Sequence, residues 1–202
     1  FSQKLAGGGI LDVGCYSVSM SRLVAGASMG KDFADPVEVK AVGHLGETGI
    51  DEYTAGLLTF ENGIIAQVST GVSLAQDNVV RIYGTEGSIV VRDPWIPARE
   101  GGETVIELNK KGSDPEKITV KTDRWLYSLE ADMVAKNIEN RQGVSPAMTW
   151  KDTLGNMKTL DMWREQIGLV FDMEKPDADE MKIPVHRGSL SVRDDSIITY
   201  GE

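Results

Sequence analysis

Three consecutive glycines, Gly7 to Gly9, lead directly into a helix-like apolar pattern over residues 10–24. Glycine adopts compact backbone conformations that residues with a Cβ atom rarely reach, so this segment predicts a tight turn at the start of a helix. Asp12 and Tyr16 follow four residues apart, a spacing that places both side chains on one face of an α-helix, about one turn apart. A carboxylate and a phenol held in this way predict a site for sugar handling or proton transfer.

The same residues also have a purely structural interpretation. In it, Asp12 stabilises the first helical turn through the helix dipole, and Tyr16 packs in the core. A phosphate at the helix N-terminus is a further alternative for the glycines. Because Lys4 is the only basic residue ahead of the helix, tight packing or the close approach of a cofactor ring is the preferred interpretation.

Composition limits the classes of function. The chain has 202 residues, enough for one domain with a substantial core, and its formal net charge of -10 argues against nucleic-acid binding. No apolar run approaches the roughly 20 residues of a membrane span, and the first residues lack the layout of a signal peptide. The single cysteine, Cys15, excludes an internal disulfide and is predicted to be a buried small hydrophobe. These observations favour a reducing, cytoplasmic setting.

The order of elements predicts an α+β domain. After the first helix, β-branched segments separated by turn signals predict strands at residues 37–45, 52–60, 64–72, 79–83, 88–92, 104–108 and 118–121. Asn62-Gly63 predicts an antiparallel hairpin between the second and third strands. Helices are expected at residues 126–140 and from an N-cap at Thr149 to about residue 169.

Apolar residues fall on both faces of the predicted strands. Ala55 and Leu57 share one face, and Leu58 and Phe60 share the other. We therefore expect an open, mostly antiparallel sheet with helices packed on one face and the other face available for oligomerisation. The domain is predicted to span residues 1–171, followed by a polar linker or surface arm at residues 172–202.

Other candidate residues are less specific. Trp95, next to Pro94 and near Pro97, is interpreted as lining a substrate pocket or as anchoring a packed loop. Trp125, Trp150 and Trp163 are predicted to lie in the core between helices and sheet. His44 and His186 are far apart in the sequence and have no metal-ligand spacing, so no metal site is predicted.

Four segments taken in order resemble the C-terminal domain of the Gfo/Idh/MocA oxidoreductases. They are GGGILDVGCY, TFENGIIAQVS, IYGTEGSIVV and the helix pair at residues 128–164, and the resemblance extends over about residues 5–168. It implies a partner Rossmann domain that binds NAD or NADP. The chain contains no GxGxxG motif after a strand, so by itself it is expected to be inactive and to bind neither cofactor.

The resemblance also implies roles for residues. Tyr16 stands at the acid/base position and Asp12 beside it, while Gly8 and Gly9 approach the nicotinamide. Trp95 and Ser19 are candidate substrate-binding residues. Many relatives have an aspartate where this chain has Ser19, so the details of their substrates are not transferable.

A lysine from a Glu-Lys-Pro motif in the Rossmann half assists proton transfer in the family. Glu174-Lys175-Pro176 spells the same tripeptide, but it follows the last helix instead of preceding the glycines. It is therefore interpreted as a coincidence.

The sequence thus predicts the substrate-binding and oligomerisation domain of a NAD(P)-dependent oxidoreductase that acts on a sugar, a polyol or a related alcohol. Two alternatives stay open: a non-catalytic dimerisation module, and a family branch that uses NAD for glycoside cleavage.

Overall fold

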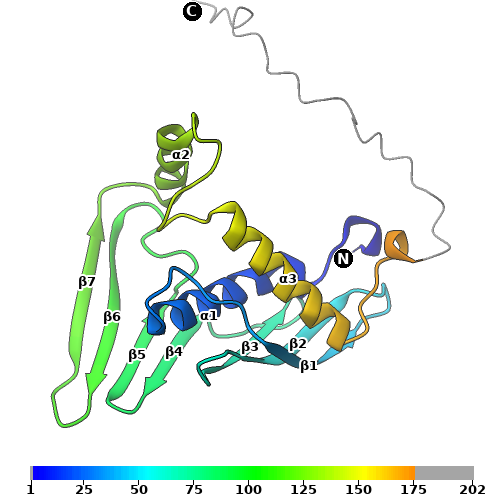
Figure 1. The fold of residues 1–202 in the computed structure, drawn as a ribbon, viewed down its shortest axis with the longest axis horizontal. Helices are drawn as coiled ribbons and strands as arrows, with labels where there is room; N and C mark the ends of the chain where they lie inside the picture. Colours follow the sequence, from blue (N-terminus) through cyan, green and yellow to red (C-terminus); the bar gives the residue numbers. More distant parts are fainter. Residues whose placement is uncertain (1, 176–202) are drawn as a thin grey trace, which may run out of the picture.

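The structure, a computed structural model, describes residues 2–175 (Figure 1). The predicted surface arm from residue 176 onward, with Pro176 and His186, lies outside the described residues. The N-terminal part consists of the 3-10 turn η1 (Gln3–Leu5), the π-helical turn η2 (Ile10–Gly14), helix α1 (Cys15–Ser28) and strands β1 (Glu38–Leu45), β2 (Asp51–Thr59) and β3 (Ile65–Gly71). The remainder consists of β4 (Val79–Gly84), β5 (Gly87–Arg92), β6 (Gly102–Lys110), β7 (Glu116–Thr122), α2 (Leu126–Asn137), α3 (Trp150–Gln166) and the 3-10 turn η3 (Asp172–Glu174). The predicted α+β class is confirmed.

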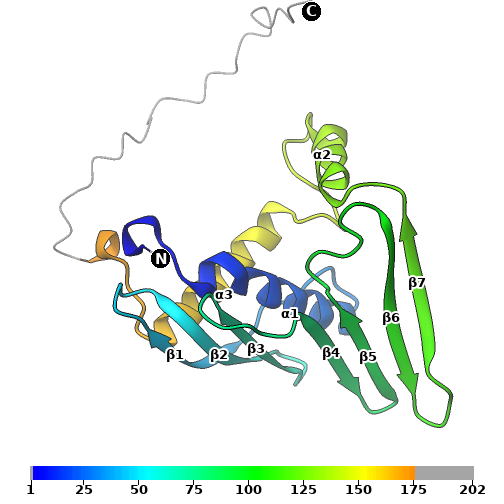
Figure 2. The same ribbon diagram turned by 180° about the vertical axis from the view of Figure 1, so that it is seen from behind.

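The strands form two open antiparallel sheets. Strands β1, β2 and β3 pair in that order, and β4, β5, β6 and β7 form the second sheet. Figure 2 shows the two sheets following one another along the molecule. The break falls at residues 72–78, where an exposed run of mostly small and polar residues leads from β3 to β4 without pairing the two strands.

The hairpin between β2 and β3 follows the Asn-Gly signal. The N–H of Phe60 donates to the carbonyl of Ile64 at 2.9 Å, and the N–H of Gly63 donates to the carbonyl of Phe60 at 2.9 Å. Gly63 has a φ of 83°, a left-handed conformation that favours glycine at this turn. The predicted antiparallel pairing is confirmed.

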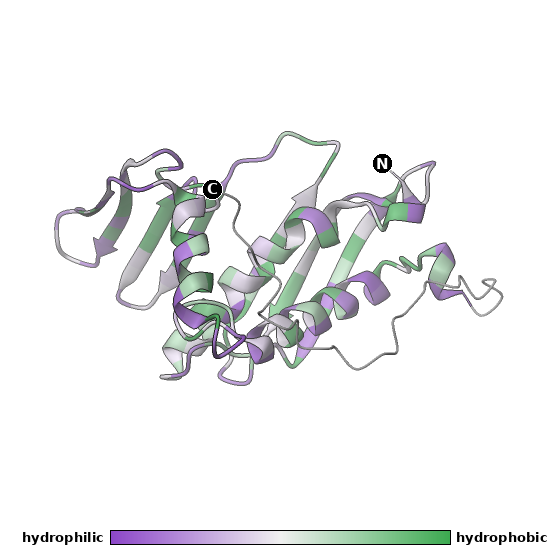
Figure 3. Cartoon of the chain, turned by 90° about the horizontal axis from the view of Figure 1, so that it is seen from above, coloured by the Kyte–Doolittle hydropathy of each residue, from purple (hydrophilic) through white to green (hydrophobic). Residues whose placement is uncertain are grey.

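The core lies between the first sheet and helices α1 and α3, which cover one of its faces (Figure 3). Leu58 and Phe60 are buried on that face, whereas Leu57 is 47% exposed on the other, as the alternation along β2 predicts. Trp163 of α3 is completely buried, and its Nε1 donates to Oγ1 of Thr54 at 2.9 Å. The predicted core position of Trp163 is confirmed.

Two other tryptophans contradict the prediction. Trp125 is 61% exposed and Trp150 is 62% exposed. Trp125 immediately precedes α2, and Trp150 is the first residue of α3. Figure 1 shows that α2 and the N-terminal end of α3 both lie away from the first sheet, so neither tryptophan reaches the core. Within residues 2–175, no helix covers the second sheet, and none of its strand residues is buried.

Helix α1 extends beyond residue 24, where the predicted helical pattern ends, and continues through Gly26 to Ser28. The glycine serves a close approach, because a Cβ atom there would lie 2.3 Å from the Cα of Phe33. Thr149 is the N-cap of α3 as predicted, and its Oγ1 accepts from the N–H of Asp152 at 3.2 Å.

A buried arginine ties these parts together. Arg22 of α1 is completely buried, and its Nε and Nη2 donate to Oδ1 of Asp35 at 2.9 and 2.7 Å. Its Nη1 donates to the carboxylate of Asp152 in α3, and its guanidinium lies 4.8 Å from the ring centroid of Phe33. One side chain therefore joins α1, α3 and the segment that leads to β1.

Within the described residues, no helix combines the length and apolar character that a bilayer crossing requires.

Candidate functional site

The glycine segment packs against two buried polar residues of the first sheet. Asp51 is the first residue of β2, and its Oδ2 accepts from the N–H of Ile10 at 2.7 Å. Thr70 of β3 donates from its Oγ1 to the carbonyl of Gly9 at 3.0 Å. Gly8 has a φ of 132°, and a Cβ atom there would lie 2.0 Å from Oδ1 of Asp51. Glycine is therefore required here by both conformation and space.

These contacts explain the glycines at positions 8 and 9 by packing within the protein itself, without any ligand. Both residues are buried, and a Cβ atom on Gly9 would lie 3.2 Å from Oγ1 of Thr70. This is the tight packing that the sequence favoured over a phosphate site. The contact of these two glycines with a nicotinamide stays a prediction.

Asp51 was not predicted as a site residue. Its side chain is completely buried, and this burial raises the pKa of its carboxyl above the ordinary value near 3.8. Backbone hydrogen bonds, chiefly from Ile10, and the charge of Arg164 act in the opposite direction. An aspartate at the start of a strand is ordinary in sequence, and only the fold shows that it faces the glycines.

Asp12 and Tyr16 lie where this turn becomes a helix. Asp12 belongs to the π-helical turn η2, and Tyr16 is the second residue of α1. Hydrogen bonds in a π-turn span five residues instead of four, so the helix is locally wider than the predicted α-helix. Such turns occur often at functional sites.

Both polar groups of this pair are accessible. Asp12 is exposed and Tyr16 is 50% exposed, so the interpretation that Tyr16 packs in the core is wrong. Among the residues that the structure describes, neither the Asp12 carboxylate nor the Tyr16 hydroxyl has a hydrogen-bond partner. Both are therefore available to a ligand.

Trp95 meets Tyr16 at this position. Their ring centroids are 5.9 Å apart, with an angle of 34° between the ring planes. Trp95 belongs to the connection between β5 and β6, which is far from α1 in sequence. The structure thus brings the rings of Tyr16 and Trp95 together, and Asp12 lies four residues before Tyr16 in the preceding turn. Ser19 lies one turn further along α1 and is half-buried.

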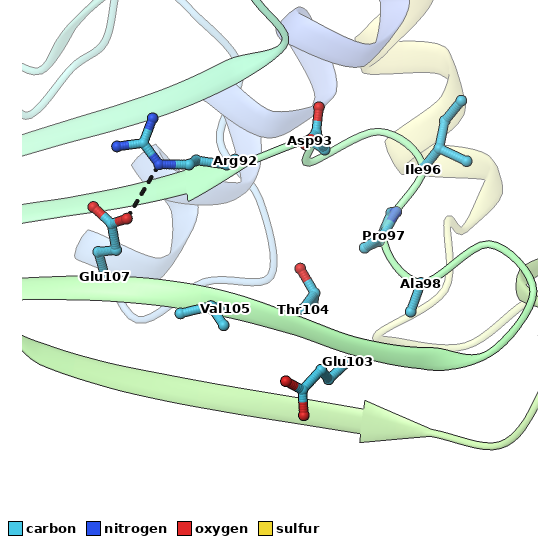
Figure 4. A pocket seen from close by; sticks show the side chains of 9 residues that line it. All are labelled: Arg92, Asp93, Ile96, Pro97, Ala98, Glu103, Thr104, Val105 and Glu107. Atoms are coloured by element: carbon cyan, nitrogen blue, oxygen red, sulfur yellow. Dashed lines mark hydrogen bonds and ion pairs between the residues drawn. The ribbon is translucent and has the colours of Figure 1, made fainter.

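A shallow pocket lies on another side of the same connection (Figure 4). Its volume is about 480 Å³, and it opens between Ile96, Pro97 and strand β6. Nε of Arg92 donates to Oε1 of Glu107 at 3.1 Å in its wall. Trp95 is absent from its lining, so this pocket is separate from the contact between Trp95 and Tyr16.

Cys15 lies beside the pair, and it is only partly buried instead of buried as the sequence predicts. The thiol is half-buried, and its Sγ donates to the carbonyl of Asp12 at 3.5 Å. Burial raises the pKa of this thiol, which disfavours the nucleophilic thiolate.

Glu174 and Lys175 have structural partners at the end of the described chain. The Glu174 carboxylate accepts from Arg164 and from the N–H of Phe171, which lowers its pKa. Lys175 pairs with Asp172 at 2.6 Å. The interpretation of the tripeptide as a coincidence stays a prediction, because Pro176 lies outside the described residues. Among the described residues, no three potential metal ligands gather in one place.

Comparisons with known proteins extend this description. A family profile for the GFO/IDH/MocA C-terminal domain matches residues 1–90. Trans-1,2-dihydrobenzene-1,2-diol dehydrogenase from Mus musculus is 27% identical over 175 residues, which cover 84% of this chain and 49% of that protein. D-xylose 1-dehydrogenase (NADP(+)) 2 from Haloferax volcanii is 25% identical over 158 residues, which cover 78% of this chain and 45% of that protein. The chain spans about half the length of the curated relatives it matches.

Solved structures share the fold. A 3-ketoreductase from Actinomadura kijaniata, crystallised with NADP and TDP-benzene in an open conformation, aligns with a TM-score of 0.64 at 19% identity. The alignment covers 80% of this chain and 48% of that one. UDP-N-acetylglucosamine 3-dehydrogenase from Acidithiobacillus ferrooxidans aligns with a TM-score of 0.61 at 15% identity, over 78% and 46% of the two chains. The resemblance predicted from the sequence is confirmed.

Proposed function

We propose that this chain is the substrate-binding and oligomerisation domain of a NAD(P)-dependent oxidoreductase, because the GFO/IDH/MocA C-terminal profile matches residues 1–90 and the curated relatives are oxidoreductases. The substrate is a sugar, a polyol or a related alcohol. The names of the relatives support this class, since one is a dehydrogenase of a vicinal diol and another of D-xylose. Each compound presents a hydroxyl-bearing carbon within a small polyhydroxylated molecule.

One observation carries the proposal: where α1 begins, the accessible phenol of Tyr16 contacts the indole of Trp95, and the exposed carboxylate of Asp12 lies four residues earlier. Tyr16 and Trp95 are in ring contact, and Asp12 precedes Tyr16 by one widened turn. This combination provides a hydrogen-bond acceptor, a proton-exchanging group and an apolar surface for a sugar ring.

Each residue has a role in this proposal. The Tyr16 hydroxyl exchanges a proton with the reacting oxygen of the substrate. A free tyrosine has a pKa of about 10, so a phenol in this role needs a neighbouring cation to exchange protons efficiently at neutral pH. The Asp12 carboxylate accepts a hydrogen bond from a substrate hydroxyl and thereby orients it. Trp95 supports the apolar face of the ring.

A nicotinamide, when bound, supplies the donor or acceptor of the hydride. Asp12 and Tyr16 suit a cofactor that approaches from outside this domain, because both side chains face solvent. The glycines do not form an open cradle for it, since Asp51 and Thr70 fill the space beside them.

The described residues contain no strand–helix–strand unit of the kind that binds dinucleotides. We therefore expect this chain by itself to show neither dehydrogenase activity nor measurable affinity for NAD or NADP. Titration calorimetry of the isolated chain tests this expectation, and tight binding of either cofactor would contradict it.

The oligomerisation role concerns the uncovered face of the first sheet. Val42, Leu57 and Ile65 are 76%, 47% and 66% exposed there. Apolar side chains on a flat, uncovered sheet favour association with a second copy of the chain.

The experiment is an activity screen of the protein encoded by the complete reading frame. Sugars, polyols and vicinal diols are offered with NAD or NADP, and formation of the reduced cofactor is followed by absorbance. Glycoside release is measured in parallel on the same preparation. Reduced cofactor formed in step with substrate oxidation supports the proposal. Glycoside release without net reduction identifies the glycosidase branch, and inactivity in both assays favours a non-catalytic module.

A further inference from the structure

The turn that precedes the candidate site is held from two strands at once. Asp51 of β2 accepts from the N–H of Ile10 at 2.7 Å, and Thr70 of β3 donates to the carbonyl of Gly9 at 3.0 Å. Asp51 is completely buried and Thr70 is 3% exposed. The two hydrogen bonds engage the C=O and the N–H of a single peptide group, the one that joins Gly9 to Ile10, so they fix both the position and the orientation of this turn.

The backbone geometry allows little adjustment around these bonds. Gly8 packs its α-carbon against Oδ1 of Asp51, and the carbonyl of Gly8 then accepts from the N–H of Asp12 at 3.3 Å. The clamped turn is therefore continuous with the helical hydrogen bonding that carries Asp12. Asp12 and Tyr16 follow the turn within two helical turns on a continuous backbone. A displacement of the turn therefore also displaces these two residues.

We propose that Asp51 and Thr70 are positioning residues: they hold the Gly8–Ile10 turn and thereby set the directions of Asp12 and Tyr16 toward Trp95. Neither residue touches the substrate in this arrangement. The inference deepens the proposed function, on which its catalytic consequence rests. Its structural consequence is measurable in the absence of any reaction.

The Asp51 carboxylate makes its hydrogen bond to the turn through only one of its two oxygens. Oδ2 of Asp51 has its backbone donor, whereas its buried Oδ1 has no hydrogen-bond partner among the described residues. Loss of that single hydrogen bond would leave both oxygens of a buried carboxylate without a partner, which is energetically costly. A charge-assisted bond to a helix N-terminus is stronger than the bond that an amide would make in its place.

The test compares four variants of the full-length protein. D51N keeps the shape of the side chain and removes its charge, and T70V keeps the volume and removes the hydroxyl. T70S restores the hydroxyl and serves as the conservative rescue. T54V is the control for loss of a buried threonine hydroxyl, because Thr54 is 4% exposed and its Oγ1 bonds to the carbonyl of Val42 at 2.8 Å and to Nε1 of Trp163 at 2.9 Å, neither of which belongs to the glycine turn.

Two spectroscopic readouts report on the clamp directly. Amide hydrogen exchange of Ile10 is expected to accelerate about tenfold or more in D51N, the loss typical of a charge-assisted hydrogen bond. The nuclear Overhauser contact between the rings of Tyr16 and Trp95 is expected to weaken in D51N and T70V. T70S and T54V are expected to retain both signals.

Kinetics of the active protein give the third readout. Misplacement of Asp12 and Tyr16 predicts a fall in kcat of about tenfold to a hundredfold in D51N, with KM for the cofactor nearly unchanged. Unchanged exchange at Ile10 and an unchanged ring contact in folded D51N and T70V would overturn the inference, as would an equal response in T54V. If D51N does not fold, the T70V and T70S pair decides by the same signals. An inactive wild-type protein would refute the proposed function, while the exchange and ring-contact data would still decide whether the clamp exists.

Discussion

The rings of Tyr16 and Trp95 lie 5.9 Å apart between centroids, although Tyr16 belongs to the first helix and Trp95 to a connection in the second sheet. This contact joins the part of the chain built on the first sheet to the part built on the second. It also creates, beside Asp12, the mixed polar and aromatic surface on which the proposed function depends.

The first prediction concerns Trp95. Replacement by alanine in the active protein removes the aromatic surface beside Tyr16, and we expect KM for the substrate to rise about threefold to tenfold. The cofactor KM is expected to stay within about twofold, because the change removes substrate contact only. W95F keeps an aromatic ring and serves as the control. Steady-state kinetics with each substrate varied in turn provide the measurement, and an unchanged substrate KM in W95A would contradict the role.

Arg22 is expected to be a determinant of stability. R22M removes the guanidinium that joins Asp35 and Asp152, and we expect the free energy of unfolding to fall by about 3 kcal/mol, typical of a broken buried ion pair. K40M is the matched control, because the Lys40–Glu38 pair is 70% and 51% exposed. Its effect is expected to be within about 0.5 kcal/mol. Urea unfolding followed by fluorescence measures both, and equal effects would refute the assignment.

The pH dependence of stability is expected to reveal Asp51. Burial raises its folded pKa above the unfolded value near 3.8, so the folded state holds this proton more tightly than the unfolded state. The contribution of Asp51 is therefore fully present below about pH 3.8 and is lost as pH rises through the folded pKa. D51N has no such titration. The free energy of unfolding of the wild type, minus that of D51N, should decrease as pH rises through this acidic range.

Glu174 provides the internal contrast for that measurement. Its pKa is lowered chiefly by the hydrogen bond from the N–H of Phe171, so its contribution is present above the unfolded pKa and is lost as pH falls through the folded pKa. The free energy of unfolding of the wild type, minus that of E174Q, should therefore increase as pH rises, whereas the same difference for D51N should decrease. Parallel changes in the two variants would contradict the assignment of either group.

The open face of the first sheet is expected to mediate association. I65K places a charge on a residue that is 66% exposed on that face, and it is expected to shift the protein toward the monomer. V134K changes a residue that is 65% exposed on α2 and serves as the matched control. Sedimentation velocity at several concentrations provides the measurement. An I65K variant with the wild-type distribution of species would remove this face from consideration.

Local signals in the sequence were sufficient for much of the fold. Asn62-Gly63 specifies the β2–β3 hairpin because its turn needs a left-handed residue, and Thr149 specifies the start of α3 through a bond to the nearby Asp152. Both depend on residues within a few positions of one another. The spacing of Asp12 and Tyr16 predicted only that they share one helix face; their assignment to a site came from the family resemblance and stays a prediction.

The features that were missed depend on contacts distant in sequence. Asp51 and Arg22 gain their importance from burial and from partners in other elements, which no local pattern encodes. Trp125 and Trp150 were assigned to the core by residue type, yet α2 and the start of α3 lie beyond the covered sheet. The π-turn at residues 10–14 was taken for an α-helix, since the apolar spacing of so short a segment fits both.

The central claim is that the Tyr16 hydroxyl exchanges a proton with the substrate. Y16F in the full-length protein removes that hydroxyl, which is accessible and has no partner among the described residues, so the fold and its stability should be retained. Y53F is the control, because Tyr53 is also partly exposed at 40% but lies on the sheet, stacked on His44. The measurement is kcat of both variants at neutral pH. We predict a fall of about a hundredfold or more for Y16F with little change for Y53F, and turnover of Y16F within about twofold of the wild type would contradict the account.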